Sequence, residues 1–303
     1  MTSISGHSIG SQGMVGGIDG AAASDEALAW ATEEAVRRDL TLHCFGASER
    51  EVPFPGDELV LPHHFSFGSP DRTAELVADA VATAQRASPR LEVTSQVVAG
   101  FAAATLVALS VHADTIVIGN RGHGVLAAAL MGSVATQVTT HARCPVVVVR
   151  EPEPMPSGLD GVVIGVDTGS TSKPALAYAF QQASDRGCRL DVVHVWWSTV
   201  PTGLTDDVRR DQVTRQEVGL AKMLAGWTEK YPDVAVHRHL PIGPTVNTLV
   251  EESLQSQLLV VGSRGRGGFR RLLLGSVGQG VLQHARCPVA VVPTGTLEDR
   301  ARS

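Results

Sequence analysis

Short apolar runs alternate with helix-like patterns along the C-terminal half of the chain. The run VVIGV (162–166) is continuous and largely β-branched, and Asp167 follows it, which predicts a buried strand that ends at a carboxylate. The apolar positions between Ala175 and Ala183 then fall on one face of a helix. The same patterns predict further strands over 190–197, 234–240, 258–262 and 288–292, and helices over 206–230, 244–256 and 276–285. Strands that alternate with helices indicate an α/β fold, in which helices cover both faces of a parallel sheet.

The N-terminal half repeats this order. Twelve of the eighteen positions in 132–149 are identical to those in 275–292, including the string HARCPV. GIDGAAASDEALAWATEEA (17–35) likewise matches GVDTGSTSKPALAYAFQQA (165–183). The repeat predicts strands near 14–18, 40–46, 91–98, 114–118 and 145–149. The chain is therefore an internal duplication.

The segment EPEPMPSGLDG (151–161) is rich in proline and glycine and separates the two copies, so we interpret it as a linker. We expect a first domain over 1–150 and a second domain over 162–303. Each domain is expected to be a sandwich around a five-stranded parallel sheet. The two tandem domains are expected to pack together as a pseudo-dimer.

Composition narrows the class of protein. An apolar fraction of 43% and a net charge of -6 are typical of a soluble globular protein and argue against nucleic acid as a partner. No apolar run reaches the ~18 residues of a membrane span, and the nearest, 101–113, predicts a buried helix. The N-terminus lacks the basic and apolar segments of a secretory signal. Cys44, Cys144, Cys188 and Cys287 form no Cys-x-x-Cys pair, so we expect four small buried thiols and a cytoplasmic location.

A glycine-rich loop occurs in both copies. GNRGHGVLAAALMGSV (119–134) and GSRGRGGFRRLLLGSV (262–277) both read G-x2-G-x9-G-S, and both join the end of a predicted strand to the start of a predicted helix. A helix start presents unpaired N–H groups and a partial positive charge, so it is a site for an anion. Glycines let the backbone approach such a ligand closely. We expect Ser133 and Ser276 at the N-cap positions, where their hydroxyls would reach a phosphate.

An aspartate stands at the end of the first strand of each copy, at Asp19 and Asp167. A carboxylate at this place accepts hydrogen bonds from ribose hydroxyls or from an adenine amine. The loop and the aspartate together predict one nucleotide cleft in each copy. The loop is not a Walker P-loop, because no G-x4-G-K-[ST] occurs, and no G-x-G-x-x-G follows a first strand as in a dinucleotide fold.

With these features the chain resembles the universal stress protein family in its tandem-domain, ATP-binding form, from about Met14 to Pro293. The resemblance implies a Rossmann-like fold of the adenine nucleotide alpha hydrolase type, ATP as the ligand with or without Mg²⁺, and homodimers formed through the last strand. In the first copy it implies a nucleotide site made of Gly17, Asp19, Gly119, Asn120, Arg121, Gly122, His123, Gly124, Val125, Gly132, Ser133 and Val134. In the second copy it implies a site made of Gly165, Asp167, Gly262, Ser263, Arg264, Gly265, Arg266, Gly267, Gly268, Gly275, Ser276, Val277 and Gly278.

The two copies differ within the loop. The second copy carries Arg264, Arg266, Arg270 and Arg271, whereas the first has His123 at the position of Arg266. Arginine suits phosphate contacts because its guanidinium binds two oxygens at once. We therefore expect the second copy to bind a triphosphate more tightly than the first.

The leading functional hypothesis is a nucleotide-dependent regulator or sensor in stress or growth control. The alternatives are a slow ATPase, a nucleotidyl- or phosphotransferase, and a protein that binds cyclic AMP. Phosphoryl transfer needs metal ligands and a residue that positions the nucleophile, yet each copy offers only one aspartate beside its loop. We therefore expect at most slow ATP hydrolysis and name no catalytic residue.

Histidines add no metal site to this picture. His63 and His64 are adjacent, but no third ligand stands at a supporting spacing. His237 and His239 share one face of a predicted strand, and that strand (234–240) contains no acid or cysteine. We expect both of these histidines to be exposed.

Overall fold

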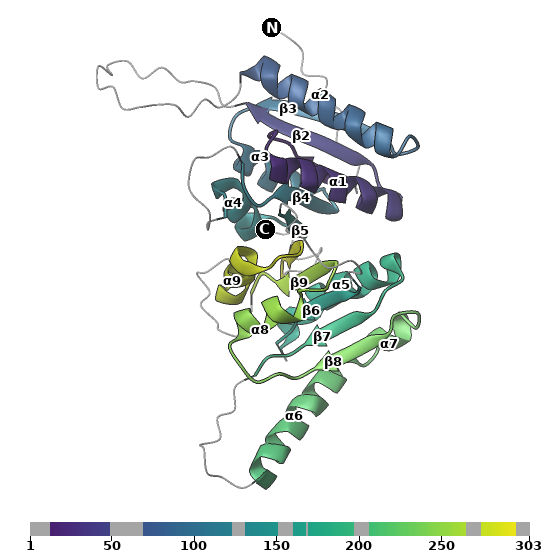
Figure 1. Ribbon diagram of the computed structural model, residues 1–303, viewed down its shortest axis with the longest axis vertical. Coiled ribbons are helices and arrows are strands. Elements are labelled where there is room, and N and C mark those ends of the chain that lie inside the picture. Colours follow the sequence, from purple (N-terminus) through teal and green to yellow (C-terminus); the bar gives the residue numbers. More distant parts are fainter. Residues whose placement is uncertain are drawn as a thin grey trace, which may run out of the picture. The chain divides into compact units, whose positions relative to one another are not determined.

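The computed structural model describes residues 13–48, 69–122, 131–150, 160–167, 169–196, 206–264 and 274–294. The chain divides into two compact units, Met1–Glu151 and Pro152–Ser303. Figure 1 shows that each unit consists of helices packed on a sheet of parallel strands.

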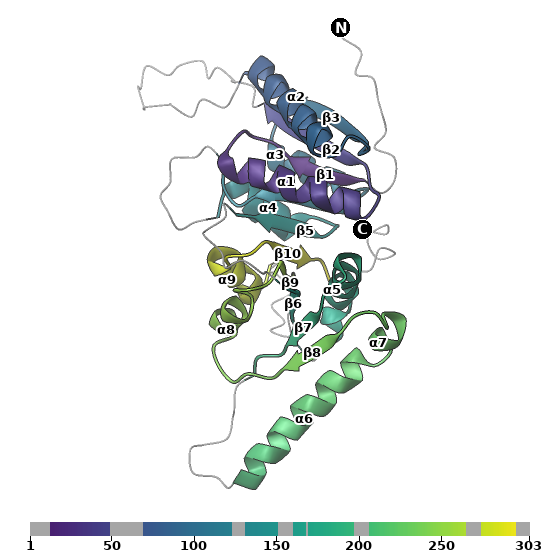
Figure 2. The ribbon, with the colours of Figure 1, turned by 45° about the vertical axis from the view of Figure 1, so that its right-hand side comes forward.

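The first unit has its strands in the order β3-β2-β1-β4-β5, and every pairing between them is parallel. Met14 of β1 lies opposite Leu42 of β2 on one side and Thr115 of β4 on the other. Helices α1 and α2 pack together on one face of the sheet, and α3 and α4 pack together on the other (Figure 2). Its elements are β1 (Met14–Gly17), α1 (Ala22–Arg37), β2 (Leu42–Ser48), α2 (Pro70–Ala87), β3 (Val93–Ala99), α3 (Ala102–Leu109), β4 (Thr115–Gly119), α4 (Ser133–His141) and β5 (Val146–Val149).

The second unit repeats this plan, with its strands in the order β8-β7-β6-β9-β10, again in parallel pairs. Helix α5 packs against β6 and β9, and α8 packs against α9. Its elements are β6 (Val162–Gly165), η1 (Ser170–Ser172), α5 (Lys173–Arg186), β7 (Leu190–Val193), α6 (Asp206–Leu224), α7 (Trp227–Lys230), β8 (Val236–His239), α8 (Thr245–Glu252), β9 (Leu258–Gly262), α9 (Ser276–His284) and β10 (Val289–Val292).

The cores are built from the apolar runs that predict the strands. Val162 and Ile164 of β6, and Leu258, Leu259 and Val260 of β9, have no exposed surface. Continuous burial of consecutive residues is what a parallel sheet covered on both faces requires, because alternate side chains point to opposite faces. The prediction of an α/β fold with parallel sheets in two tandem domains is confirmed.

Several predicted elements have different bounds; the helix expected over 244–256, for example, covers only Thr245–Glu252. The single helix expected over 206–230 is broken, because Gly226 adopts φ 82° between α6 and α7. A left-handed glycine ends a helix, so α6 ends at Leu224, inside the range predicted for one continuous helix. The strand expected over 190–197 stops at Val193, and Trp196 forms an isolated bridge with Ile242.

Burial also differs from expectation at two places. The apolar stretch 101–113 does form helix α3, but Phe101 before it is 73% exposed, and the buried residues of the helix are Ala103 and Leu106. Cys188 is half-buried, unlike the other three cysteines, because it lies just beyond the end of α5.

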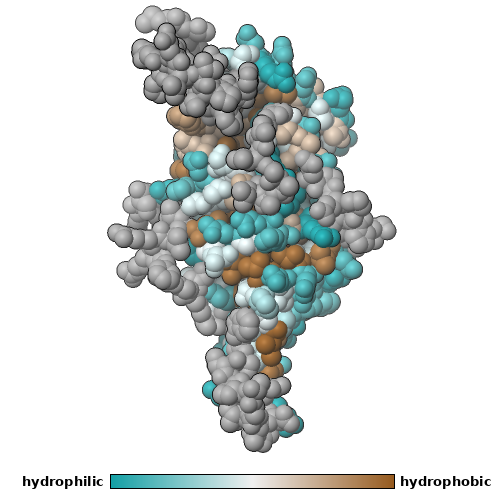
Figure 3. Space-filling model, turned by 60° about the vertical axis from the view of Figure 1, so that its left-hand side comes forward, coloured by the Kyte–Doolittle hydropathy of each residue, from teal (hydrophilic) through white to brown (hydrophobic). Residues whose placement is uncertain are grey.

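The described surface mixes hydrophobic and hydrophilic residues. Val36, Phe101, Val111 and Ile242 are each more than half exposed, and Figure 3 shows hydrophobic residues set among hydrophilic ones on the face that it presents. Single exposed hydrophobic residues are ordinary in folded proteins. Within the part of the chain that the structure describes, no helix is both long and apolar enough to cross a membrane.

Candidate functional site

The predicted site residues of the first unit that the structure describes lie around the carboxyl ends of β1 and β4. These two strands are neighbours, and the order of the sheet reverses there, because β2 and β3 lie on one side of them and β5 on the other. In open α/β sheets, ligands bind outside the strand ends at such a reversal. Asp19 follows β1, and the glycine loop begins with Gly119 at the end of β4.

Backbone hydrogen bonds close the base of the first glycine loop. The N–H of Asn120 donates to Val149 O at 2.8 Å, and the N–H of Gly132 donates to Asn120 O at 2.9 Å. The first hydrogen bond of helix α4 runs from Thr136 N to Gly132 O, at 3.0 Å. The three N–H groups that precede it, those of residues 133–135, have no acceptor within the helix. They form a partly positive helix end beside the closed loop.

Two glycines of this loop allow close contacts. A Cβ atom on Gly119 would lie 2.8 Å from the carbonyl carbon of Ala23 in α1, and one on Gly122 would lie 2.5 Å from Asp19 Oδ2. Real Cβ atoms do not approach other atoms so closely. The absence of a side chain at Gly122 therefore lets the Asp19 carboxylate lie directly against the glycine loop.

The second unit closes its loop in the same way. Ser263 N donates to Val292 O at 2.7 Å, Gly275 N donates to Ser263 O at 2.8 Å, and Gln279 N donates to Gly275 O at 3.0 Å. The backbone of the base is therefore built identically in both copies, although Asn120 is replaced by Ser263. Both of these side chains are buried.

The serines that follow the last glycine of each loop are not at the N-cap position, so that prediction is wrong. The N-cap residues are Gly132 and Gly275, with ψ 155° and 158°, and neither helix has a side-chain cap. Ser133 and Ser276 are the first helical residues and are exposed. Gly132 and Gly275 have extended backbones, and their N–H groups make the hydrogen bonds that close the loops. Each helix therefore has its N-cap one residue before the serine that was predicted to be the N-cap.

The remaining predicted site residues lie in different environments. Arg264 is exposed and Gly278 is buried. The half-buried residues are Gly17, Arg121, Val134, Gly165, Gly262 and Val277. A Cβ atom on Gly278 would lie 3.0 Å from Leu274 Cδ1, so Gly278 serves packing inside the unit. Seven predicted site residues lie outside the described part of the chain: His123, Gly124, Val125, Gly265, Arg266, Gly267 and Gly268.

Comparison with known proteins identifies the family. A sequence profile described as the universal stress protein family matches residues 12–150 and 159–293. The chain belongs to this family. The resemblance to the universal stress protein family, with one family domain in each copy, is thereby confirmed.

Relatives of this universal stress protein are similar over nearly their whole length. One universal stress protein of Mycobacterium tuberculosis is 36% identical over 292 residues, which are 92% of this chain and 96% of the relative. Another from the same organism is 37% identical over 294 residues, 93% of this chain and 96% of the relative. The crystal structure of a universal stress protein from Archaeoglobus fulgidus shares the fold, with a TM-score of 0.65 and 20% identity over 94% of this chain and 97% of that one.

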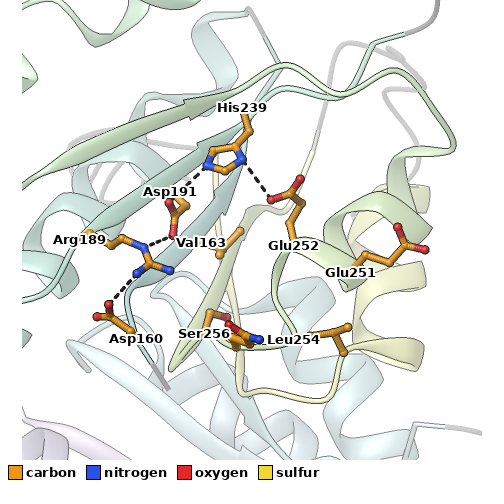
Figure 4. A pocket seen from close by; sticks show the side chains of 10 residues that line it. Asp160, Val163, Arg189, Asp191, His239, Glu251, Glu252, Leu254 and Ser256 are labelled. Atoms are coloured by element: carbon orange, nitrogen blue, oxygen red, sulfur yellow. Dashed lines mark hydrogen bonds and ion pairs between the residues drawn. The ribbon is translucent and has the colours of Figure 1, made fainter. Parts of the chain in front are cut away.

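Sequence reasoning missed one polar cluster of this universal stress protein. His237 Nδ1 and His239 Nε2 each lie 3.4 Å from Asp191 Oδ1, and His239 Nδ1 lies 3.2 Å from Glu252 Oε2. The expectation that both histidines are exposed is confirmed for His237 and wrong for His239, which is half-buried beside two carboxylates. Figure 4 shows His239 between the two carboxylates. The register of the parallel strands explains the contact, because it sets Asp191 of β7 opposite His237 of β8.

Arg189 extends this cluster towards the amino end of the sheet. Its Nε lies 2.9 Å from Asp191 Oδ2 and its Nη1 lies 2.6 Å from Asp160 Oδ2, and the hydrogen bond to Asp191 raises the pKa of Arg189. A pocket of about 350 Å³ lies beside these side chains (Figure 4). Asp160 and Arg189 precede β6 and β7, so the pocket is at the amino end of the second unit's sheet, opposite the glycine loop of that unit. The described residues contain no cluster with the make-up of a metal site.

Proposed function

We propose that this universal stress protein binds one ATP, with or without Mg²⁺, in each unit and acts as a nucleotide-dependent regulator. One observation carries the proposal. In each unit, hydrogen bonds close the base of the glycine loop, and the loop leads into a helix whose first N–H groups have no acceptor in the helix. The strand before this loop pairs with the strand that ends near an aspartate. Helix ends of this kind bind phosphate through N–H groups and the helix dipole.

The aspartates match the other half of a nucleotide. A carboxylate accepts hydrogen bonds from ribose hydroxyls or from a base amine, but it repels a phosphate. The Asp19 carboxylate lies beside Gly122 of the glycine loop. The phosphates of a bound nucleotide can therefore contact the helix end while its nucleoside contacts the Asp19 carboxylate. This division favours a nucleotide over inorganic phosphate.

Regulation is proposed rather than fast catalysis. The described residues offer each cleft one aspartate and no cluster of metal ligands, whereas rapid phosphoryl transfer needs several such groups. Slow ATP hydrolysis, nucleotidyl or phosphoryl transfer, and binding of cyclic AMP are alternatives. For ATP to regulate the binding of a partner protein, the partner must have different affinities for the ATP-bound and the ATP-free protein.

Two further parts of the proposal have other support. Self-association into a homodimer follows from the family resemblance, and sedimentation velocity would test it. A cytoplasmic location agrees with four free cysteines, and fractionation of cells would test it.

Substitutions at the two N-cap glycines test the proposal. The backbone of Gly132 (φ −61°) and of Gly275 (φ −73°) suits an aspartate, which is a preferred N-cap residue. Gly132→Asp and Gly275→Asp are therefore expected to keep or raise stability while setting a negative charge where the phosphates would bind. Like charges at such a distance weaken binding by roughly 100-fold or more. Gly132→Asn and Gly275→Asn, which cap equally well without charge, are the matched controls.

The measurement is the nucleotide bound to the purified chain, counted by mass spectrometry after denaturation and by calorimetric titration with ATP. We expect two ATP per chain in the original protein, one in each Asp variant and none in the double Asp variant, in line with its two units. The Asn variants should lose less affinity than the Asp variants. Unchanged ATP binding in the double Asp variant would refute the proposed site. Titration with cyclic AMP and an assay for phosphate release address the alternatives.

A further inference from the structure

Helix α6 of the second unit lies further from its strands than the corresponding helix of the first unit. Helix α2 packs closely against β2 and β3, whereas, among the described residues, α6 approaches neither β7 nor β8 as closely. Figure 1 and Figure 2 both show α6 leading away from the strands of its unit. Because the two units are copies of one plan, the cause must lie in the residues between helix and sheet.

One replacement between helix and sheet explains the difference. Gly46 and His194 occupy equivalent positions, because each stands four residues after the first residue of its strand, Leu42 of β2 or Leu190 of β7. A Cβ atom on Gly46 would lie 2.6 Å from Val77 Cγ2, so α2 packs directly on the bare backbone of β2. His194 places an imidazole there, and it is buried. The ring fills the space that lets α2 come close, so α6 is held further out.

His194 also connects α6 to the first strand of the unit. Its Nδ1 lies 2.9 Å from Val166 O, and its Nε2 lies 3.2 Å from Gln216 Oε1 of α6. A carbonyl oxygen only accepts, so Nδ1 carries the proton and donates. A glutamine amide has both donor and acceptor groups, so Gln216 is able to pair with Nε2 whether or not that nitrogen is protonated. The ring therefore forms a bridge between α6 and the residue that follows β6.

This histidine bridge ends on the peptide group that leads into the second cleft. The C=O of Val166 and the N–H of Asp167 belong to one planar peptide group. His194 holds its carbonyl, and Ser172 Oγ accepts from its N–H at 3.3 Å. Because the group is rigid, a force that tilts it at the cleft also acts on the imidazole.

The first unit shares only one half of this arrangement. Ser24 Oγ accepts from Asp19 N at 3.2 Å, as Ser172 does in the second unit. Ile18 O, the counterpart of Val166 O, lies 3.7 Å from the place where Gly46 would carry a Cβ atom. Glycine has no side chain to donate, so position 46 provides no bridge to α2.

We infer that His194 couples helix α6 to the nucleotide cleft of the second unit. A ligand bound at the end of β6 restrains the 166–167 peptide group, and His194 transmits this restraint to Gln216 and so to α6. The inference rests on the proposed function and identifies α6 as the element through which the second unit responds to its ligand. Helix α2 lacks the histidine bridge and is the reference within the same chain.

Hydrogen–deuterium exchange of the ligand-free chain tests the histidine bridge itself. Short labelling times report local opening of a helix rather than unfolding of the whole unit. Gln216→Met keeps the length of the side chain but removes its polar group, so the amides of α6 should exchange about threefold to tenfold faster, as expected for one lost hydrogen bond. Exchange in α2 should not change.

Lys222→Met is the matched control for this comparison. Lys222 lies on the same helix and is exposed, so its replacement should leave the exchange of α6 as it is. Equal exchange of α6 in Gln216→Met and Lys222→Met would overturn the inference.

The same exchange experiment at saturating ATP tests the coupling. In the original protein, ATP should slow the exchange of α6 by about fivefold or more, which is an ordinary coupling between two sites, and should leave α2 unchanged. Gly275→Asp, which blocks the second cleft, should abolish the response of α6, whereas Gly132→Asp should keep it. Gln216→Met should also abolish it while calorimetry still finds ATP bound, and so should His194→Asn, which keeps a donor for Val166 O but is too short to reach Gln216.

Two results would overturn the coupling. One is bound ATP without any change in α6 of the original protein, and the other is a change in α6 that persists in Gln216→Met. If calorimetry found no ATP bound to the original protein, the coupling and the proposed function would both fail. The comparison of ligand-free variants would then still show whether His194 holds α6.

Discussion

Burial sets the acid–base chemistry of single residues in both units. Burial raises the pKa of Cys44 to about 12, and it also raises the pKa of Cys287, against the opposing effect of Ser256. Thiols in this state are protonated near neutral pH and react slowly. Burial also shifts the pKa of His43, but downwards, because it disfavours the charged form of an imidazole.

His43 makes a testable contribution to the dependence of stability on pH. It lies on β2, with Nδ1 2.5 Å from Thr94 Oγ1 of β3, and its pKa is below the ordinary value of 6.5. The unfolded chain then binds the proton more readily than the folded chain. The contribution of neutral His43 to the free energy of unfolding is fully present above pH 6.5. It is lost as the pH falls from 6.5 through the lowered pKa of the folded state.

Urea unfolding at pH 7.5 and at pH 5 measures this effect. His43→Gln, which cannot be protonated, should lose less stability on acidification than the original protein. Glu92→Gln should lose more, because the charge of Glu92 opposes the lowering of the His43 pKa. Equal acid sensitivity of all three proteins would contradict this assignment.

At the scale of elements, the break between α6 and α7 reorients a short helix onto α5. The rings of Phe180 and Trp227 stack at 5.7 Å, those of Phe180 and Tyr231 stack at 5.5 Å, and Tyr231 Oη donates to Gln181 Oε1 at 3.1 Å. Stacked rings add to the free energy of burial. These contacts hold α7 where a continuous helix would not reach.

Gly226 is the hinge of this arrangement. Its φ of 82° is strained for residues with a side chain, and a Cβ atom there would meet no atom within 4 Å. Gly226→Ala should therefore lower the free energy of unfolding by about 1–2 kcal/mol through backbone strain alone. Gly226→Asn should cost less, since asparagine tolerates the left-handed conformation. Chemical denaturation measures both, and equal stability of the Ala variant would show that the segment readjusts.

At the scale of the whole molecule, the duplication provides two closed glycine loops of the same design. Ligands that bind only the folded chain stabilise it by mass action. If both clefts bind ATP, each occupied cleft contributes separately to the stability of its own unit. The two units therefore allow the clefts to be compared within one chain.

Thermal or chemical unfolding with and without ATP tests this coupling. At roughly 100 times its Kd, ATP should raise the free energy of unfolding by about 2.7 kcal/mol for each occupied cleft. The gain should be confined to the second unit in Gly132→Asp and to the first in Gly275→Asp. It should be absent in the double variant. Stabilisation of the double variant equal to that of the original protein would place the ligand elsewhere.

The duplication, the parallel α/β fold and the position of the glycine loops along the chain can be predicted from the amino-acid sequence alone. Strands such as VVIG (162–165) and LLVVG (258–262) are continuous apolar runs because both faces of their sheet are covered, and this pattern is visible along the chain. The pairing of the first strand with the fourth then brings Asp19 to the loop that begins at Gly119. The apolar runs and the glycine loops are local patterns that recur in both copies.

Which polar groups contact one another depends on how the chain folds. Asp191 contacts His237 and His239 because of strand register, and Ser24 and Ser172, identical in sequence, have different acceptors. The N-cap glycines were likewise set by loop-closing hydrogen bonds rather than by the serine that follows. Hydrogen bonds depend on distances of a few tenths of an ångström and on the direction of each side chain. Neither follows from the order of apolar and polar residues, so these contacts emerge only when the chain is folded.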